Sequence, residues 1–179
     1  MLTNLEEQQM IDLAKKMGSQ WTPGLYNALA PKFALTAIET VFLRMKEDGS
    51  AEVEVLLARR LHSDAHYPNQ WHSPGTMLRA VDVPEETEMY LGIPELNGFR
   101  KALDRLVNSE LGLRFKGEPR QVKSILHFTP RGPEVALIFL CELDGEPKFG
   151  EFFSVNQLPS DLIEHHYRII KVAVDNFKE

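Results

Sequence analysis

The stretch Phe99–Leu113, FRKALDRLVNSELGL, decides how the rest of the chain is interpreted. Its apolar residues recur at helical intervals: Phe99, Ala102, Leu103, Leu106 and Val107. This spacing predicts a helix over 99–110 with one apolar face. Gly112 suits the position just after the C-terminus of such a helix. We therefore expect a helix that packs on a sheet and a chain that leaves it at Leu113 toward a strand.

Strands are predicted on both sides of this helix. Phe33–Met45 and Ala51–Leu61 are rich in β-branched or alternating apolar residues, and the turn signal Glu47–Ser50 between them predicts a hairpin. Further strands are predicted over 121–129, 133–143 and 151–155. Helices are predicted over 3–17 and after Leu158-Pro159-Ser160, whereas 23–31 and 62–74 are predicted as loops. Because helices and strands do not alternate strictly, the order favours an α/β fold with a mixed sheet.

Composition excludes several classes of protein. The 179 residues suit about one domain, and 26 acidic against 20 basic residues give a net charge of −6, which argues against binding to nucleic acid. No apolar stretch approaches the ~20 residues of a membrane span, and the N-terminus carries no signal-peptide pattern. The single cysteine, Cys141, lies in an apolar run and is expected to be buried and inert. We expect a cytoplasmic protein that contacts no membrane.

Three motifs appear in the order that one known family shows. Arg105–Leu113 resembles the end of a Nudix box, R-E-U-x-E-E-x-G-U with U a bulky aliphatic residue, and five positions match: Arg105, Val107, Glu110, Gly112 and Leu113. Trp71–Gly75 resembles the tryptophan and Pro-Gly-Gly before the box, and Glu151–Pro159 resembles the strand and turn before the last helix. The resemblance implies an α/β/α sandwich with a mixed sheet. It implies a Nudix-like domain over 33–179, preceded by an N-terminal helix and lead-in over 1–32.

The box departs from the family pattern at its acids. Leu106 and Ser109 stand where the family has glutamates, so only Glu110 remains, and the spacing implies an insertion of about a dozen residues. The resemblance implies Mg²⁺ or Mn²⁺ if the protein is active and no cofactor otherwise, because hard cations need several converging carboxylates. Glu110 is then the candidate metal ligand, and Glu110 and Arg105 are the candidate catalytic residues. Acids from the insertion could replace the missing ones: Glu85, Glu86 and Glu88.

Ligand binding does not require the metal. Arg59, Arg60 and Arg79 could bind phosphate through their guanidinium forks, and Trp71 and His72 could line a pocket beside the Pro-Gly turn. Three hypotheses on function remain open. The first is a protein that binds a nucleotide-like (nucleoside diphosphate-linked) ligand or a partner with weak or no hydrolysis. The second is an active Mg²⁺-dependent pyrophosphohydrolase that uses acids of the insertion, and the third is an interaction domain without a small-molecule site. The N-terminal helix is a candidate contact of a homodimer.

Overall fold

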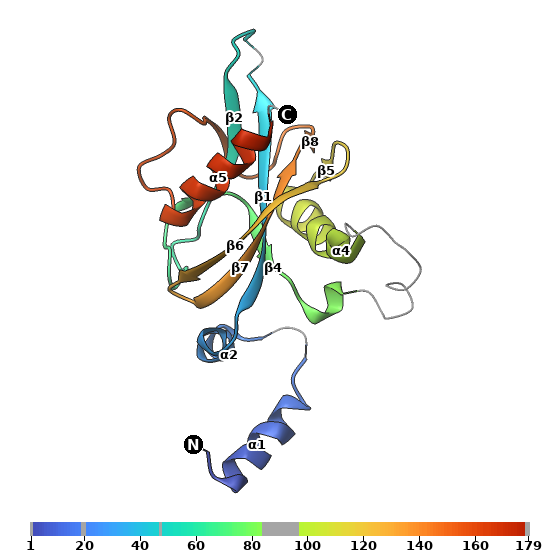
Figure 1. Ribbon diagram of the computed structural model, residues 1–179, viewed down its shortest axis with the longest axis vertical. Coiled ribbons are helices and arrows are strands. Elements are labelled where there is room, and N and C mark those ends of the chain that lie inside the picture. Colours follow the sequence, from blue (N-terminus) through green and yellow to red (C-terminus); the bar gives the residue numbers. More distant parts are fainter. Residues whose placement is uncertain (1, 19–20, 47, 84–96, 178–179) are drawn as a thin grey trace.

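The computed structural model describes residues 2–18, 21–46, 48–83 and 97–177. Its helices are α1 Asn4–Ala14, α2 Pro23–Leu29, η1 Ala30–Lys32, η2 Ala80–Asp82, α4 Asn97–Leu106, the π-helical turn η3 Val107–Leu111, and α5 Glu164–Phe177. Its strands are β1 Leu35–Met45, β2 Val53–Arg59, β3 Trp71–His72, β4 Gly75–Met77, β5 Arg114–Phe115, β6 Arg120–Thr129, β7 Gly132–Cys141, β8 Leu143–Asp144 and β9 Glu151–Ser154. The sheet lies between α4 and α5, which confirms the expected sandwich (Figure 1).

The long strand β1 organises the sheet. It pairs in parallel with β7 along one side and antiparallel with β4 and then β2 along the other. β6 pairs antiparallel with β7, and β3 and β9 pair antiparallel with β2. One parallel and several antiparallel pairings make the sheet mixed, as the sequence predicts. Strands β5 and β8 form a separate two-stranded sheet. β5 follows the helix made of α4 and η3, which carries the residues that resemble the Nudix box and is called the box helix below, and β8 follows β7.

Successive side chains of β1 point to opposite faces of the sheet and divide the core into two clusters. Val41 and Leu43 point toward α5 and contact Ile169 and Ile170 of that helix in one buried cluster. Their neighbours Ile38 and Phe42 point to the opposite face and pack in a second cluster. The α4 and η3 side chains of this second cluster are Ala102, Leu103, Val107 and Leu111. The box helix and the C-terminal helix are thus fixed on opposite faces, because successive strand residues face opposite ways.

Several predicted elements need correction. The helix expected over 99–110 is α-helical only to Leu106 and ends in a π-helical turn that Gly112 terminates at φ +67°. The loop expected over 23–31 contains α2, because the Thr22 hydroxyl caps the Leu25 N–H and Pro23 fits the first helical position. The C-terminal helix begins at Glu164 rather than near residue 160.

That late start follows from strand-like pairing before the helix. The Trp71 N–H donates to the Asp161 carbonyl, and the Ile163 N–H donates to the Trp71 carbonyl. Residues 161–163 therefore pair with β3, so they are not free to form the first turn of α5. The loop expected over 62–74 contains the short strand β3, because Trp71 and His72 pair antiparallel with the end of β2.

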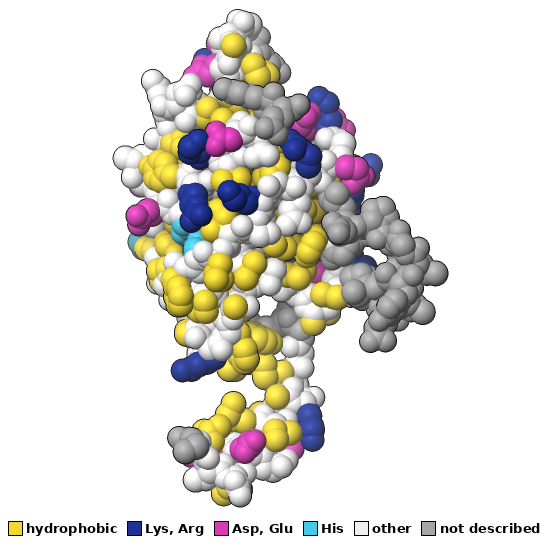
Figure 2. Space-filling model, viewed as in Figure 1, with side chains coloured by type: hydrophobic (Ala, Val, Ile, Leu, Met, Phe, Trp, Pro, Cys, Tyr) yellow, Lys and Arg dark blue, Asp and Glu magenta, His cyan; other side chains and the backbone are white. Residues whose placement is uncertain are grey.

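The N-terminal helix α1 lies apart from the sheet. Thr3 and Glu6 form a capping box at its start, but the helix predicted over 3–17 ends at Ala14 and carries no buried residue. Apolar side chains gather on this segment and on the end of the domain above it (Figure 2). Within the described ranges, no helix is long and apolar enough to cross a membrane.

Candidate functional site

The box helix presents different side chains from those an intact box would present. Leu106 is fully buried, whereas Ser109 and Glu110 in the π-helical turn are exposed. The position of the first missing acid therefore belongs to the core, as expected for a leucine that continues the apolar stripe. Ser109 offers a hydroxyl, and Glu110 is the one carboxylate among the three positions.

Arg105 is held by neighbours that precede the box. Its guanidinium ion-pairs with Asp82 of η2 at 2.7 Å, donates to the Thr76 hydroxyl at 2.8 Å and donates to the Met77 carbonyl at 3.1 Å. Desolvation disfavours the ionised form of Asp82, but hydrogen bonds from Arg105 and from the Arg79 N–H outweigh it and lower the Asp82 pKa. The acidic partner of Arg105 in the structure is therefore Asp82, a residue that the sequence did not single out. Arg105 thus ties the box helix to β4 and η2.

The carboxylate of Glu110 is a weak basis for a metal site. Although the residue is exposed, desolvation raises its pKa, and the positive charges of Arg105, Arg60 and Arg79 only partly oppose this. Across the described parts of the chain, no group of three or more His, Cys, Asp or Glu residues could hold a metal ion. The described residues therefore do not fit Mg²⁺ or Mn²⁺. Glu85, Glu86 and Glu88 lie outside them.

Two of the sequence-predicted ligand residues take part in packing at the β2–β3 edge. Arg59 ion-pairs with Asp161 at 2.8 Å and lies over the Trp71 ring, 5.2 Å from its centroid. Trp71 packs edge-on against Phe153 with ring centroids 4.9 Å apart. Both residues join β3 to the segment before α5, and their role in ligand binding stays a prediction.

His72 of β3 lies in a group of histidine rings with His165 and His166 of α5. Its ring meets that of His166 at 5.8 Å between centroids, and its Nδ1 bonds the Ser73 carbonyl at 2.8 Å. Burial lowers the His72 pKa to about 3 and the His165 pKa to about 4, so these rings are neutral at pH 7. The Ser73 hydroxyl lies 2.7 Å from His166 Nδ1, but both residues are buried, so the pair offers no accessible nucleophile.

Arg79 lies beside Asp82, whereas Arg60 belongs to a second set of charged groups that the sequence did not single out. Arg60 is 3.8 Å from Asp64, and its charge also acts on Glu39 of β1. Arg131, in the turn between β6 and β7, pairs with the fully buried Glu134 at 3.0 Å. These residues are distant in sequence and carry no local motif. They meet because β1 and β7 begin, and antiparallel β2 ends, at the same end of the sheet.

Glu39 is the most unusual of these groups. Its side chain is buried, and its Oε2 atom has no hydrogen-bond partner in the described structure. A side chain at Gly75 of β4 would place Cβ only 2.5 Å from this oxygen, so glycine leaves the room that Glu39 occupies. Burial raises the pKa of Glu39 to about 8, against the attraction of Arg131 and Arg60. Glu39 is thus largely protonated at pH 7.

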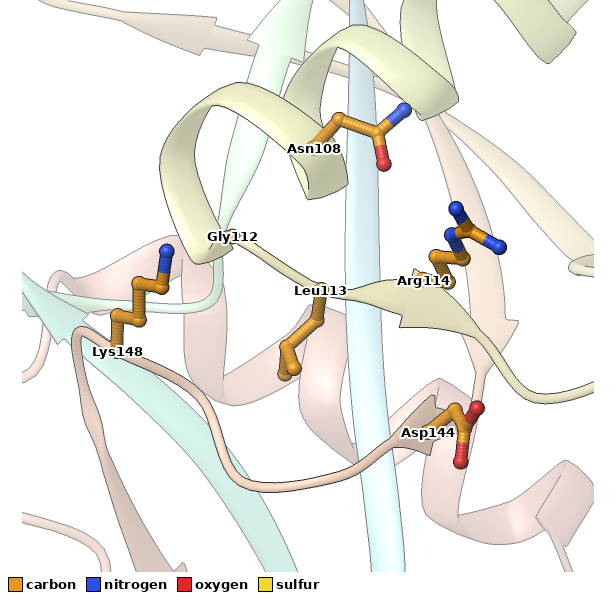
Figure 3. Close-up of a pocket in the computed structure, with 6 residues that line it drawn as sticks. All are labelled: Asn108, Gly112, Leu113, Arg114, Asp144 and Lys148. Atoms are coloured by element: carbon orange, nitrogen blue, oxygen red, sulfur yellow. The ribbon is translucent and has the colours of Figure 1, made fainter.

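A smaller pocket of about 520 Å³ lies at the end of the box helix (Figure 3). Asn108, Arg114 and Asp144 are grouped on one side of it, and Lys148 reaches toward Gly112 from the other. A Cβ on Gly112 would lie 2.6 Å from Lys148 Cδ. The pocket combines two cationic side chains with one carboxylate and contains none of the predicted site residues.

No protein-family model and no curated protein matches the chain. Solved structures do match its fold. The MutT NUDIX hydrolase from Burkholderia pseudomallei is 19% identical, with a TM-score of 0.55, over 78% of this chain and 97% of that one. The NUDIX domain of Shewanella oneidensis NrtR, complexed with ADP ribose, is 18% identical, with a TM-score of 0.54, over 88% and 99%.

A third match is a domain of a different kind of protein. The C-terminal domain of mouse MUTYH, in complex with human PCNA, is 14% identical, with a TM-score of 0.56, over 82% of this chain and 92% of that one. Similar structures thus include hydrolases and domains that contact a ligand or a protein. At 14–19% identity these matches show a shared fold, and the chain therefore has the fold of solved NUDIX structures.

Proposed function

We propose that this protein uses the Nudix fold to bind a nucleotide-like, nucleoside diphosphate-linked ligand with weak or no hydrolysis. The observation that carries the proposal is the box helix itself. Leu106 is fully buried where the family pattern has an acid, and Ser109 replaces the second. A single carboxylate, Glu110, cannot supply the converging oxygens that Mg²⁺ or Mn²⁺ needs.

The remaining polar residues of the box support binding rather than catalysis. Arg105 is occupied by Asp82, Thr76 and Met77, so it positions β4 and η2 and is not free to contact a reacting group. Arg79 lies next to this anchor and contributes positive charge at Glu110. A guanidinium beside a pocket suits a phosphate group, because it offers several N–H donors with fixed geometry.

ADP-ribose is the probe that tests this function, since one structure of similar fold is complexed with it. We expect isothermal titration calorimetry to show binding with or without Mg²⁺, and chromatography of the same mixture to show unchanged ADP-ribose. The Glu110→Gln variant should bind equally well. Turnover near ~10 s⁻¹, a typical enzyme value, would refute the proposal and favour the hydrolase with acids from the insertion. A wild-type protein that binds no nucleotide would favour an interaction domain.

Restoring the acids tests the cause of the inactivity. The double variant Leu106→Glu, Ser109→Glu places two carboxylates beside Glu110. Because Leu106 is buried, the variant should melt at a lower temperature without metal, and millimolar Mn²⁺ should restore part of the loss by binding the folded state.

The matched control is Leu106→Gln, Ser109→Gln, which has similar side-chain shapes without the charges. It should be insensitive to Mn²⁺, as should the wild type. Equal responses of the wild type and the Glu variant to Mn²⁺ would show that the metal binds acids elsewhere in the chain.

A further inference from the structure

A second cavity, larger than the pocket at the end of the box helix, lies between the N-terminal segment and one end of the sheet. It has a volume of about 1040 Å³, enough for a ligand of drug size or larger. Trp21 and Tyr26 line it from the N-terminal segment, His66 and Tyr67 from the β2–β3 loop, Arg79 from the segment after β4, and Arg131 from the β6–β7 turn. The 1–32 segment, which the resemblance leaves outside the Nudix-like domain, therefore forms one wall.

Three lining residues carry a buried polar atom without a hydrogen-bond partner: the Tyr26 hydroxyl, His66 Nε2 and Arg131 Nε. Arg131 Nε is 2.8 Å from a Glu134 oxygen, but the angle makes no hydrogen bond. An unpaired buried polar group costs folding free energy, and folded proteins satisfy about nine in ten of them. Since Arg131 Nε already lies beside the Glu134 carboxylate, the Tyr26 hydroxyl and His66 Nε2 are the two atoms that point to a bound group supplying the missing partners.

The charges around the cavity suit an anion. Arg131 is held in place by Glu134, and Arg60 behind it faces Asp64, so two of the three arginines have a carboxylate nearby. Arg79 makes no ion pair within the described residues, although its charge acts on Asp82 and Glu110, and it adds a third guanidinium on this side of the molecule. Burial keeps His72 and His165 neutral, so these rings do not compete for an anion.

The same cavity has an apolar wall. Trp21, Met77 and Leu78 line it beside the polar atoms, and Trp21 is 40% exposed. An aromatic ring next to cationic donors is suited to a ligand that joins a flat or apolar group to a phosphate. A free inorganic anion would use the donors but would leave this wall uncovered.

We propose that this cavity binds the phosphate-bearing part of the ligand, with Tyr26, His66 and Arg131 as its hydrogen-bond partners. The N-terminal segment then completes the binding site instead of serving only as a lead-in. This inference rests on the proposed function and assigns its ligand to a place away from the buried side of the box helix.

The test uses Tyr26→Phe in the full chain, because that change removes only a hydroxyl that makes no hydrogen bond. Its melting temperature should be equal to or higher than that of the wild type, because an unpaired buried hydroxyl is removed. Calorimetry with ADP-ribose and, separately, with inorganic pyrophosphate should show binding about tenfold or more weaker, the loss expected for a hydrogen bond to a charged group. His66→Leu should weaken binding similarly. Tyr167→Phe is the control: the Tyr167 hydroxyl on α5 does not line the cavity and donates to the Pro159 carbonyl, so its removal should leave binding unchanged.

The outcomes separate this inference from the proposed function. Wild-type affinity in Tyr26→Phe and His66→Leu would overturn the cavity as the binding site and leave the proposed function standing. Binding that depends on Tyr26 together with rapid hydrolysis would support the cavity and overturn the proposed function. A wild-type protein that binds neither ADP-ribose nor pyrophosphate at millimolar concentration would overturn both.

Discussion

Replacing Glu39 by glutamine should change how the stability of the fold depends on pH. Glu39 is buried, and its pKa rises from 4.5 to about 8 because burial disfavours the carboxylate. The folded state therefore holds this proton over a range in which the unfolded chain releases it. The free energy of unfolding that the raised pKa of Glu39 contributes is fully present below pH 4.5 and is lost progressively as the pH rises to about 8. Between pH 5.5 and 8 the loss amounts to about 3 kcal/mol.

The contributions of two buried histidines to stability depend on pH in the opposite direction. The pKa values of His72 and His165 are lowered by burial to about 3 and about 4. Their contributions are present above the ordinary histidine pKa and are lost as the pH falls through the folded-state values. The pH dependence of the wild type alone therefore mixes both effects, whereas the difference between wild type and Glu39→Gln isolates the carboxyl group.

Urea unfolding at several values between pH 5.5 and 8.5 measures that difference. The free energy of unfolding of Glu39→Gln, relative to wild type, should rise by about 3 kcal/mol from pH 5.5 to pH 8, since glutamine cannot ionise. Glu151→Gln is the matched control: this exposed residue on β9 should give a flat difference. A flat difference for Glu39→Gln as well would refute the reasoning, because it would mean that Glu39 ionises as freely in the folded state as in water.

Three further predictions concern the box helix and the core. Gly112→Ala should destabilise the protein by about 1 kcal/mol or more in urea unfolding, because φ is +67° and Lys148 Cδ lies 2.6 Å from the new Cβ; an unchanged midpoint would contradict this. Arg105→Met should lower the free energy of unfolding by about 3 kcal/mol, since it leaves the buried Asp82 carboxylate unpaired, and wild-type stability would show that the anchor is unimportant. Cys141 should react with a thiol reagent only as fast as the protein unfolds, because burial raises its pKa; rapid labelling of the folded protein would contradict its burial.

The sequence predicted those parts of the fold that depend on neighbouring residues. The hairpin of β1 and β2, the start of α1 and the glycine after η3 each depend on a few residues in a row. The π-helical turn was not predicted, because an apolar stripe indicates which face of a helix is buried but not whether its backbone hydrogen bonds are α-helical or π-helical. The start of α5 was also placed too early, since pairing of residues 161–163 with Trp71 is a contact across about ninety positions.

The candidate site was harder to predict for the same reason. Asp82 was missed as the partner of Arg105 because the two residues are separated by 23 positions and by the insertion. Tyr26, His66 and Arg131 form no sequence motif, and only the fold brings them to one cavity. Their one common signal is structural, a buried polar atom without a partner, and it cannot be read from spacing.

The matched and unmatched positions of the box separate fold from chemistry. Each apolar or glycine match has a structural role here: Val107 is buried, Leu113 packs against the same cluster, and Gly112 adopts the left-handed conformation that ends the helix. Arg105 also has such a role, because it holds Asp82, Thr76 and Met77 whether or not a metal is present. The positions that differ, Leu106 and Ser109, are those at which only metal chemistry would require an acid. A chain can therefore keep the box as a packing unit, and the same pattern that predicts the fold gives no support for hydrolysis.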